Sequence, residues 1–157
     1  MSNIHFRFAK EEDLDLYFNW TNEKAVRENS YRQEAISYAQ HTKWFLDKIH
    51  DQAYFFYLFF DEKNSAVGQV RIQQTATQEA LIGISIPPEV RSKGLGVSLL
   101  VAATEDFLKK FPADTIYAYI KKENQSSFHS FIKAGFVLDK TEPVEGIESY
   151  IMIKRSR

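Results

Sequence analysis

Arg91-Ser92-Lys93-Gly94-Leu95-Gly96 is the most informative segment of this chain. It follows an apolar run over 80–86 and opens a helical pattern over 97–111, which predicts a strand that turns through two glycines into a helix. Glycine lets the backbone approach a ligand closely, and the first turn of a helix leaves N–H groups unpaired where the helix dipole favours negative charge. Arg91 and Lys93 add positive charge there. The segment therefore predicts a pyrophosphate-binding site.

Two common phosphate-binding patterns do not describe this segment. A P-loop needs Gly-x4-Gly-Lys-Ser/Thr, which is absent. A dinucleotide fingerprint needs a small residue three positions after Gly96, where Leu99 stands. A glycine-rich loop with two solvated basic residues is the simpler alternative, and the six residues alone leave both interpretations open.

The length and composition bound what the chain can do. With 157 residues and 44% hydrophobic content, it fits one domain over 1–157 with a real core. A net charge of −1 provides no chain-wide attraction to nucleic acid or to an anionic membrane. The most apolar stretch, 54–60, is too short to cross a bilayer, and no signal peptide is visible in 1–10. We therefore expect a cytoplasmic protein without nucleic-acid or membrane partners.

Hydrophobic periodicity predicts a mixed α/β fold. Strands are predicted at 4–8, 54–60, 66–75, 80–86, 115–120, 136–138 and 150–153. Helices are predicted near 14–18, after a Ser37 cap, over 95–111, and between Asn124 and Gly135, whereas 20–33 is polar and is expected to be irregular. The order β-α-α-β-β-β-α-β-α-β-β predicts an α/β (α+β) domain, a mixed sheet with helices on both faces.

A second signature follows the strand at 115–120. It reads Asn124-x-x-Ser127-x-x-x-Phe131-x-x-x-Gly135-Phe136. Together with Arg-x-x-Gly-x-Gly, in this order, it resembles the GCN5-related N-acetyltransferases (the GNAT superfamily). The resemblance covers essentially the whole chain and is densest over 80–136. Asn124 and Gly135 also suit helix caps, and core packing is the simpler role for Phe128.

The resemblance implies acetyl-CoA as the cofactor, with CoA as the product. In that family the strand before the loop splays from its neighbour, and pantetheine pairs with the backbone of Ile84, Ser85 and Ile86. A backbone N–H near Ile86 would then polarise the thioester carbonyl. The remaining residues implied in cofactor binding are Arg91, Ser92, Lys93, Gly94, Leu95, Gly96, Asn124, Ser127 and Phe131. Lys121 and Lys122 could meet the adenosine 3′-phosphate, although a solvated basic pair is the simpler interpretation.

The segment 20–45 lies where the family binds the acceptor. It resembles the branch that acetylates nucleotide-linked amino sugars, as in pseudaminic acid-type pathways, and it is also similar to the branch that acetylates N-termini of ribosomal proteins. Aromatic side chains here would stack on a base, and Arg27 would bind phosphate. The residues implied in acceptor binding are Trp20, Arg27, Tyr31, His41 and Trp44.

The chemistry expected is direct acetyl transfer to the primary amine of a small molecule, because the chain has no cysteine to carry an acyl group. Glu79 and His41 are the candidate bases. Phe131 stands where the family often has a tyrosine that protonates the CoA thiolate. The proton must then come from Tyr31, Ser127 or water. The alternative is that the chain is a non-catalytic acyl-CoA-binding module. The other histidines have no metal-ligand spacing. A homodimer is compatible with the resemblance, since dimers are common in the family, and the sequence leaves the oligomeric state open.

Overall fold

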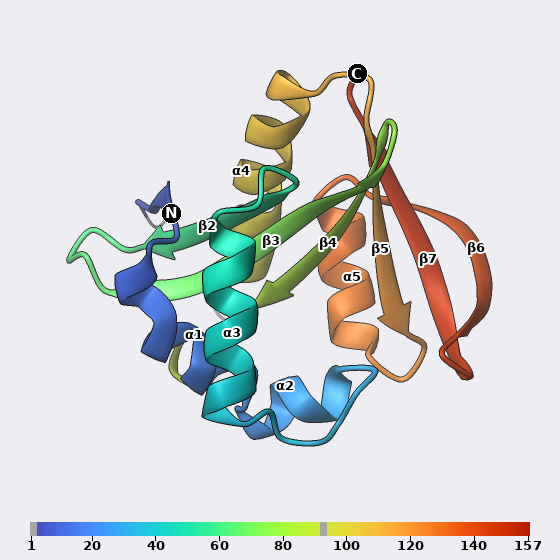
Figure 1. Cartoon of the computed structure of the whole chain (residues 1–157). Helices are drawn as coiled ribbons and strands as arrows, with labels where there is room; N and C mark the ends of the chain where they lie inside the picture. Colours follow the sequence, from blue (N-terminus) through green and yellow to red (C-terminus); the bar gives the residue numbers. More distant parts are fainter. Residues whose placement is uncertain (1–2, 92–93) are drawn as a thin grey trace.

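The computed structural model describes residues 3–91 and 94–157. It contains one seven-stranded sheet in the order β1-β2-β3-β4-β5-β7-β6 (Figure 1). The β4–β5 pair is parallel and the other neighbouring pairs are antiparallel. The strands are β1 (His5–Phe8), β2 (Tyr54–Phe60), β3 (Ala66–Ala76), β4 (Glu79–Ser85), β5 (Thr115–Lys121), β6 (Val137–Val144) and β7 (Ile147–Arg155).

The helix that follows Ser37 begins at the cap that the sequence predicts. The Ser37 hydroxyl accepts the N–H of Gln40 at 3.1 Å, and the Gln40 side chain accepts the Ser37 N–H at 3.3 Å, which is a capping box. The helices are α1 (Leu14–Thr21), α2 (Lys24–Asn29), α3 (Tyr38–Ile49), α4 (Leu95–Lys110) and α5 (Gln125–Lys133), with 3-10 turns η1 (Glu11–Asp13) and η2 (Pro88–Val90).

The helices cover both faces of the sheet, which confirms the predicted fold class. On one face α4 and α5 bury an apolar stripe against the central strands; its fully buried members include Leu99, Leu100 and Phe107. On the other face α1 and α3 bury Tyr17 and Phe45 over β2. This second face is left without a helix over β5, β7 and β6 (Figure 1).

Two parts of the secondary structure differ from the sequence prediction. The expected irregular segment 20–33 contains the end of α1 and all of α2. Helix α2 buries no residue, so it has no apolar stripe to reveal it, and the Glu23 carboxylate that accepts the Ala25 N–H at 2.6 Å starts it instead.

The last two strands form a longer hairpin than the predicted 136–138 and 150–153. They meet at a turn in which Glu145 and Gly146 both have positive φ, at 49° and 78°. Strand β6 is exposed along almost its whole length, so it lacks the alternation that marks a half-buried strand. No helix in the two described ranges is long and apolar enough to cross a bilayer.

Candidate active site

Strands β4 and β5 separate along their length. They pair at Glu79–Thr115, Ala80–Ile116 and Leu81–Tyr117, and the pairing stops there although β4 continues to Ser85 and β5 to Lys121 (Figure 1). Beyond Leu81 the facing edges of the two strands carry backbone groups without sheet partners. The splay that the resemblance implied is therefore present, and Ile84, Ser85 and Ile86 lie at its open end.

The N-terminus of α4 provides unpaired donors beside this splay. Gly94 caps α4 with a left-handed φ of 73°, and no side chain in the described part of the chain bonds the first-turn N–H groups. A Cβ at Gly94 would meet no atom within 4 Å, so there is open space in front of these donors. Leu95 is buried and leaves only its backbone for a ligand. Ser92 and Lys93 lie outside the described residues.

Gly96 brings three elements together. A Cβ there would lie 3.5 Å from Ile86 Cδ1 and 3.9 Å from Ser130 Oγ. The end of β4, the first turn of α4 and the middle of α5 thus surround one small region. Sequence reasoning missed Ser130, because only the packing of α5 against α4 turns this hydroxyl toward the glycine loop.

The second signature forms α5 as expected. The Asn124 side chain accepts the Ser127 N–H at 3.2 Å and caps the helix, and Gly135 ends it with a φ of 99°. Phe131 is 3% exposed and packs on Phe136 with ring centroids 4.9 Å apart. The polar groups of the Asn124–Ser127 cap therefore hold the helix in place, and Phe131 presents no hydroxyl.

Arg91 links the glycine loop to the N-terminal helices. Its guanidinium forms an ion pair with Glu23, the residue that also caps α2. Burial raises the pKa of the Glu23 carboxyl, but the bonds from the Ala25 N–H and from Arg91 outweigh this effect and lower it overall. Helix α2 lies at the end of the sheet toward which β4 and β5 point (Figure 1).

The predicted acceptor residue Arg27 uses its guanidinium inside the protein. It donates to the carbonyls of Arg32 at 2.9 Å and Glu34 at 3.1 Å and to the Ser30 hydroxyl at 3.3 Å. These bonds hold the segment between α2 and α3 in place. Phosphate binding by Arg27 stays a prediction that would require these bonds to be exchanged.

The predicted residues on α1 and α3 lie in an aromatic cluster. His41 is 3% exposed, its Nε2 contacts the Leu14 carbonyl at 3.1 Å, and burial lowers the pKa of its ring. Trp20 packs near Tyr17, and the Trp44 ring lies 5.5 Å from the Arg71 guanidinium. His41 is therefore a packed residue whose Nε2 already has a backbone partner, and its role as a base stays a prediction.

Tyr31 lies over the ends of β5 and β7. Its hydroxyl contacts Ser149 Oγ at 2.7 Å, and Lys121 Nζ lies 5.7 Å from its ring centroid. Lys121 is 2% exposed and donates to the Glu28 carbonyl at 3.2 Å. The interpretation of Lys121 as a solvated residue is therefore wrong, because the segment after α2 folds over the end of β5 and covers it.

Glu79 lies at the paired end of the splay. It is exposed at the start of β4, opposite Thr115, and lies about 13 Å along the strand before Gly83, where β4 no longer pairs with β5. The structure therefore places Glu79 away from the open end, where the acetyl group would lie.

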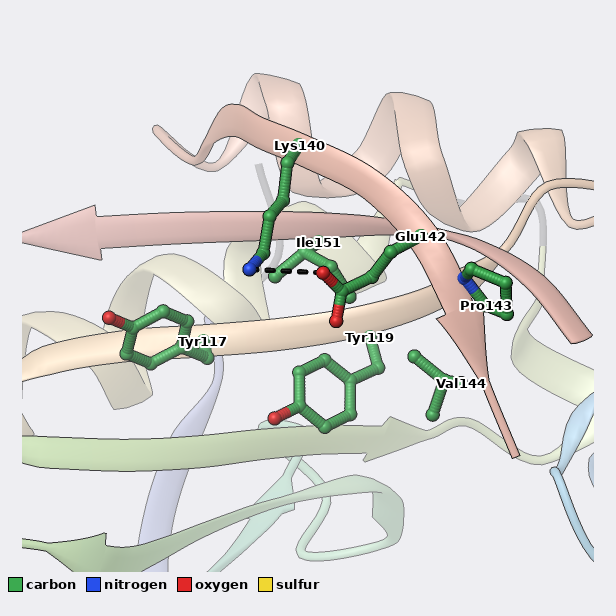
Figure 2. A pocket seen from close by; sticks show the side chains of 7 residues that line it. All are labelled: Tyr117, Tyr119, Lys140, Glu142, Pro143, Val144 and Ile151. Atoms are coloured by element: carbon green, nitrogen blue, oxygen red, sulfur yellow. Dashed lines mark ion pairs between the residues drawn. The ribbon is translucent and has the colours of Figure 1, made fainter. Parts of the chain in front are cut away.

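A shallow hollow of about 270 Å³ lies on the helix-free part of the second face. Figure 2 shows Tyr117 and Tyr119 on its floor, with the 3.0 Å ion pair between Lys140 and Glu142 above them. Tyr117 is also the last β5 residue that pairs with β4, so the hollow adjoins the splay. Sequence reasoning missed this hollow because β6 was not recognised as a long strand.

Comparison with known proteins agrees with this geometry. The model of the family described as "Acetyltransferase (GNAT) domain" matches residues 3–137. Spermidine N-acetyltransferase from Vibrio cholerae, solved with CoA and spermine, is 19% identical with a TM-score of 0.86, covering 96% of this chain and 94% of that chain. The aminoglycoside acetyltransferase AAC(6')-Ib, solved with coenzyme A and kanamycin, is 18% identical with a TM-score of 0.81, covering 98% and 95%. No curated protein sequence gives a significant match.

The two solved structures establish the fold, and the family match covers most of the chain. The splayed strands and the N-terminus of α4, where no described side chain bonds the first-turn N–H groups, are the features that the resemblance implies for binding the acyl donor. The chain therefore belongs to the GNAT acetyltransferase family and is an acetyl-CoA-dependent N-acetyltransferase.

Proposed function

We propose that the chain transfers acetyl from acetyl-CoA to the primary amine of a small molecule, with a nucleotide-linked amino sugar as the favoured acceptor. The splay of β4 from β5 beside the uncapped α4 N-terminus carries this proposal. The first-turn N–H groups of α4 and Arg91 would hold the pyrophosphate, and the open edge of β4 would pair with pantetheine. Acetyl-CoA supplies the acetyl group as a thioester.

The side chains near the splay limit how protons move. The chain has no cysteine, so the amine must attack the thioester directly. Burial raises the pKa of Tyr31, so its hydroxyl keeps its proton at neutral pH and remains a donor. Because Phe131 has no hydroxyl, we assign the hydroxyls of Tyr31 and Ser130 as the candidate donors of the proton to the CoA thiolate. Because Glu79 lies at the paired end of the splay and His41 is buried with its Nε2 at the Leu14 carbonyl, we assign removal of the amine proton to water.

The acceptor site is proposed on the second face, between α2 and the hollow over β5. Tyr31 at one side and Tyr117 and Tyr119 at the other would enclose a ligand there. A second candidate class of acceptor is a polyamine or an aminoglycoside, which the two similar structures favour. A ribosomal-type N-terminal peptide and a non-catalytic CoA-binding module are the further alternatives. The homodimer and the cytoplasmic location stay predictions.

The test is acceptor-dependent release of CoA from acetyl-CoA. The panel contains a UDP-linked 4-amino sugar, the same sugar without UDP, spermidine, kanamycin and a ribosomal-type N-terminal peptide. Release with the UDP-linked sugar, and little with the free sugar, is the expected result. Release only with spermidine, kanamycin or the peptide would reassign the acceptor to that class. Binding of CoA without release for any amine would favour the non-catalytic module.

A further inference from the structure

Arg71 stands at the open end of the splay. It lies on β3, directly opposite Phe56 of β2 and Gly83 of β4. A Cβ built on Gly83 would lie 3.7 Å from Arg71 Nη2, so the guanidinium reaches over the place where Gly83 has no side chain. Gly83 is the second residue after the last β4 residue that pairs with β5. The guanidinium therefore lies beside the unpaired strand edges, on the face that carries α1 and α3.

This guanidinium has no polar partner within residues 3–91 and 94–157. It lies 5.5 Å from the Trp44 ring and forms no hydrogen bond or ion pair in these two ranges. Arg7 and Arg91 by contrast form ion pairs with carboxylates, and Arg27 donates to three acceptors. A half-buried guanidinium without an acceptor is costly, and burial accordingly lowers the pKa of Arg71.

A second donor without a partner lies next to Arg71. Tyr17 is 4% exposed, and its hydroxyl has no hydrogen-bond partner among the described residues. The Tyr17 ring packs against Phe56 at 5.9 Å, and the charge of Arg71 acts on its phenol. Burial raises the pKa of Tyr17, so the hydroxyl keeps its proton. Two neighbouring groups on two different elements thus both lack an acceptor, and an oxyanion would satisfy both.

We propose that Arg71, with the hydroxyl of Tyr17, binds an oxyanion of the acceptor, a phosphate or a carboxylate carried by the amine that is acetylated. This inference rests on the proposed function and narrows its substrate class. Two guanidinium N–H groups can bind two oxygens of one anion, which both anchors the acceptor and orients it. A polyamine would instead bring further positive charge toward Arg71, so the acceptor is acidic.

The test uses two successive calorimetric titrations of the full chain. CoA is added first until the pyrophosphate site is saturated, so that a second anion cannot bind there. UDP or L-glutamate is then titrated into the CoA-saturated protein, and the two arms distinguish a phosphate from a carboxylate. The variants are Arg71→Gln, Tyr17→Phe and the control Arg155→Gln, which changes an exposed arginine on β7 of the same sheet.

We expect one of the two anions to bind the wild type. Its affinity should fall at least tenfold in Arg71→Gln and several-fold in Tyr17→Phe, and it should be unchanged in Arg155→Gln. Arg71→Gln should unfold at the same temperature or higher, because it removes an unpaired charge. Equal anion binding by wild type and Arg71→Gln, or no binding of either anion, would overturn the inference and leave the proposed function standing. Failure of CoA itself to bind would overturn both.

Discussion

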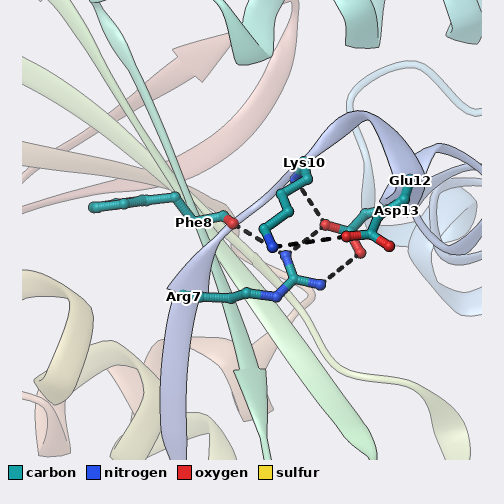
Figure 3. Close-up of polar contacts among 5 residues, drawn as sticks. All are labelled: Arg7, Phe8, Lys10, Glu12 and Asp13. Atoms are coloured by element: carbon teal, nitrogen blue, oxygen red, sulfur yellow. Dashed lines mark hydrogen bonds and ion pairs between the residues drawn. The ribbon is translucent and has the colours of Figure 1, made fainter.

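At the scale of single residues, Asp13 shows how one carboxylate joins β1 to η1. Arg7 donates to both of its oxygens at 2.8 and 3.0 Å, and the Lys10 N–H donates at 2.7 Å (Figure 3). Burial favours the neutral acid, yet the bonds from Arg7 and Lys10 outweigh it and hold the pKa of Asp13 below its ordinary value. A depressed pKa means that this stabilisation is present at neutral pH and is lost as the pH falls through the folded-state pKa.

We therefore predict that Asp13→Asn lowers the free energy of unfolding at pH 7 by about 1.5–3 kcal/mol, the usual range for hydrogen bonds to a charged group. Urea denaturation at several pH values would measure it, and the difference from wild type should shrink below about pH 4. The control is Glu12→Gln, because the Glu12 side chain is 68% exposed and lies 3.8 Å from Lys10 Nζ. A difference that persists unchanged at pH 2.5 would contradict the prediction.

Phe131 supports a prediction about the leaving group. The resemblance implies a tyrosine hydroxyl at this position that protonates the CoA thiolate, so we expect Phe131→Tyr to raise kcat by about tenfold, below the usual range for general acids. Steady-state kinetics with the best acceptor of the panel would measure it. Phe128→Tyr is the matched control, since Phe128 lies on the same helix but packs on Tyr150 at 4.3 Å. An equal rise in both variants would count against an acid at Phe131.

At the scale of elements, the N-terminus of α4 allows a closely matched comparison. Gly94 and Gly146 have left-handed φ values of 73° and 78°, and a Cβ at either would meet no atom within 4 Å. Gly94→Leu and Gly146→Leu should therefore both lose about 1–2 kcal/mol of stability through backbone strain.

Only the Gly94 variant should lose affinity for CoA, because only its side chain would project in front of the uncapped α4 donors. We expect the Kd for CoA, measured by calorimetry, to rise at least on the order of tenfold for Gly94→Leu. The Gly146→Leu value should match wild type. Unchanged CoA binding in Gly94→Leu would mean that the pyrophosphate does not bind at this helix terminus.

At the scale of the whole molecule, the Arg91–Glu23 ion pair joins the glycine loop to the segment proposed to cover the acceptor. A pyrophosphate must compete with Glu23 for Arg91. Partly exposed ion pairs are worth about 0.2–1 kcal/mol, so Glu23→Gln should tighten CoA binding by up to about fivefold. The glutamine oxygen can still accept the Ala25 N–H and keep α2 capped.

Titration of CoA at low and high salt would measure this effect, which should fade as salt screens the charges. Glu28→Gln, at an exposed position of α2, is the matched control and should leave CoA binding unchanged. Weaker CoA binding in Glu23→Gln would show that Glu23 orients Arg91 toward the ligand and does not compete with it.

Local signals were sufficient for the caps, the glycine loop and most of the elements. Ser37, Asn124 and Gly94 act through backbone atoms within three residues, so their roles can be inferred from neighbours in the sequence. Periodicity also predicted the mixed sheet. It missed the polar α2 and most of the exposed β6, because neither buries an apolar stripe.

The sequence by itself determined the family and the fold class, since ordered motifs and short-range backbone geometry carry them, and it predicts where the cofactor binds. Only the tertiary structure decided which polar groups remain free for chemistry. It placed Glu79 at the paired end of the splay, occupied Arg27 with the neighbouring loop, and left Arg71 without a polar partner in residues 3–91 and 94–157. Such availability depends on contacts between residues far apart in the chain, as between Tyr31 and Ser149, and no local pattern encodes it.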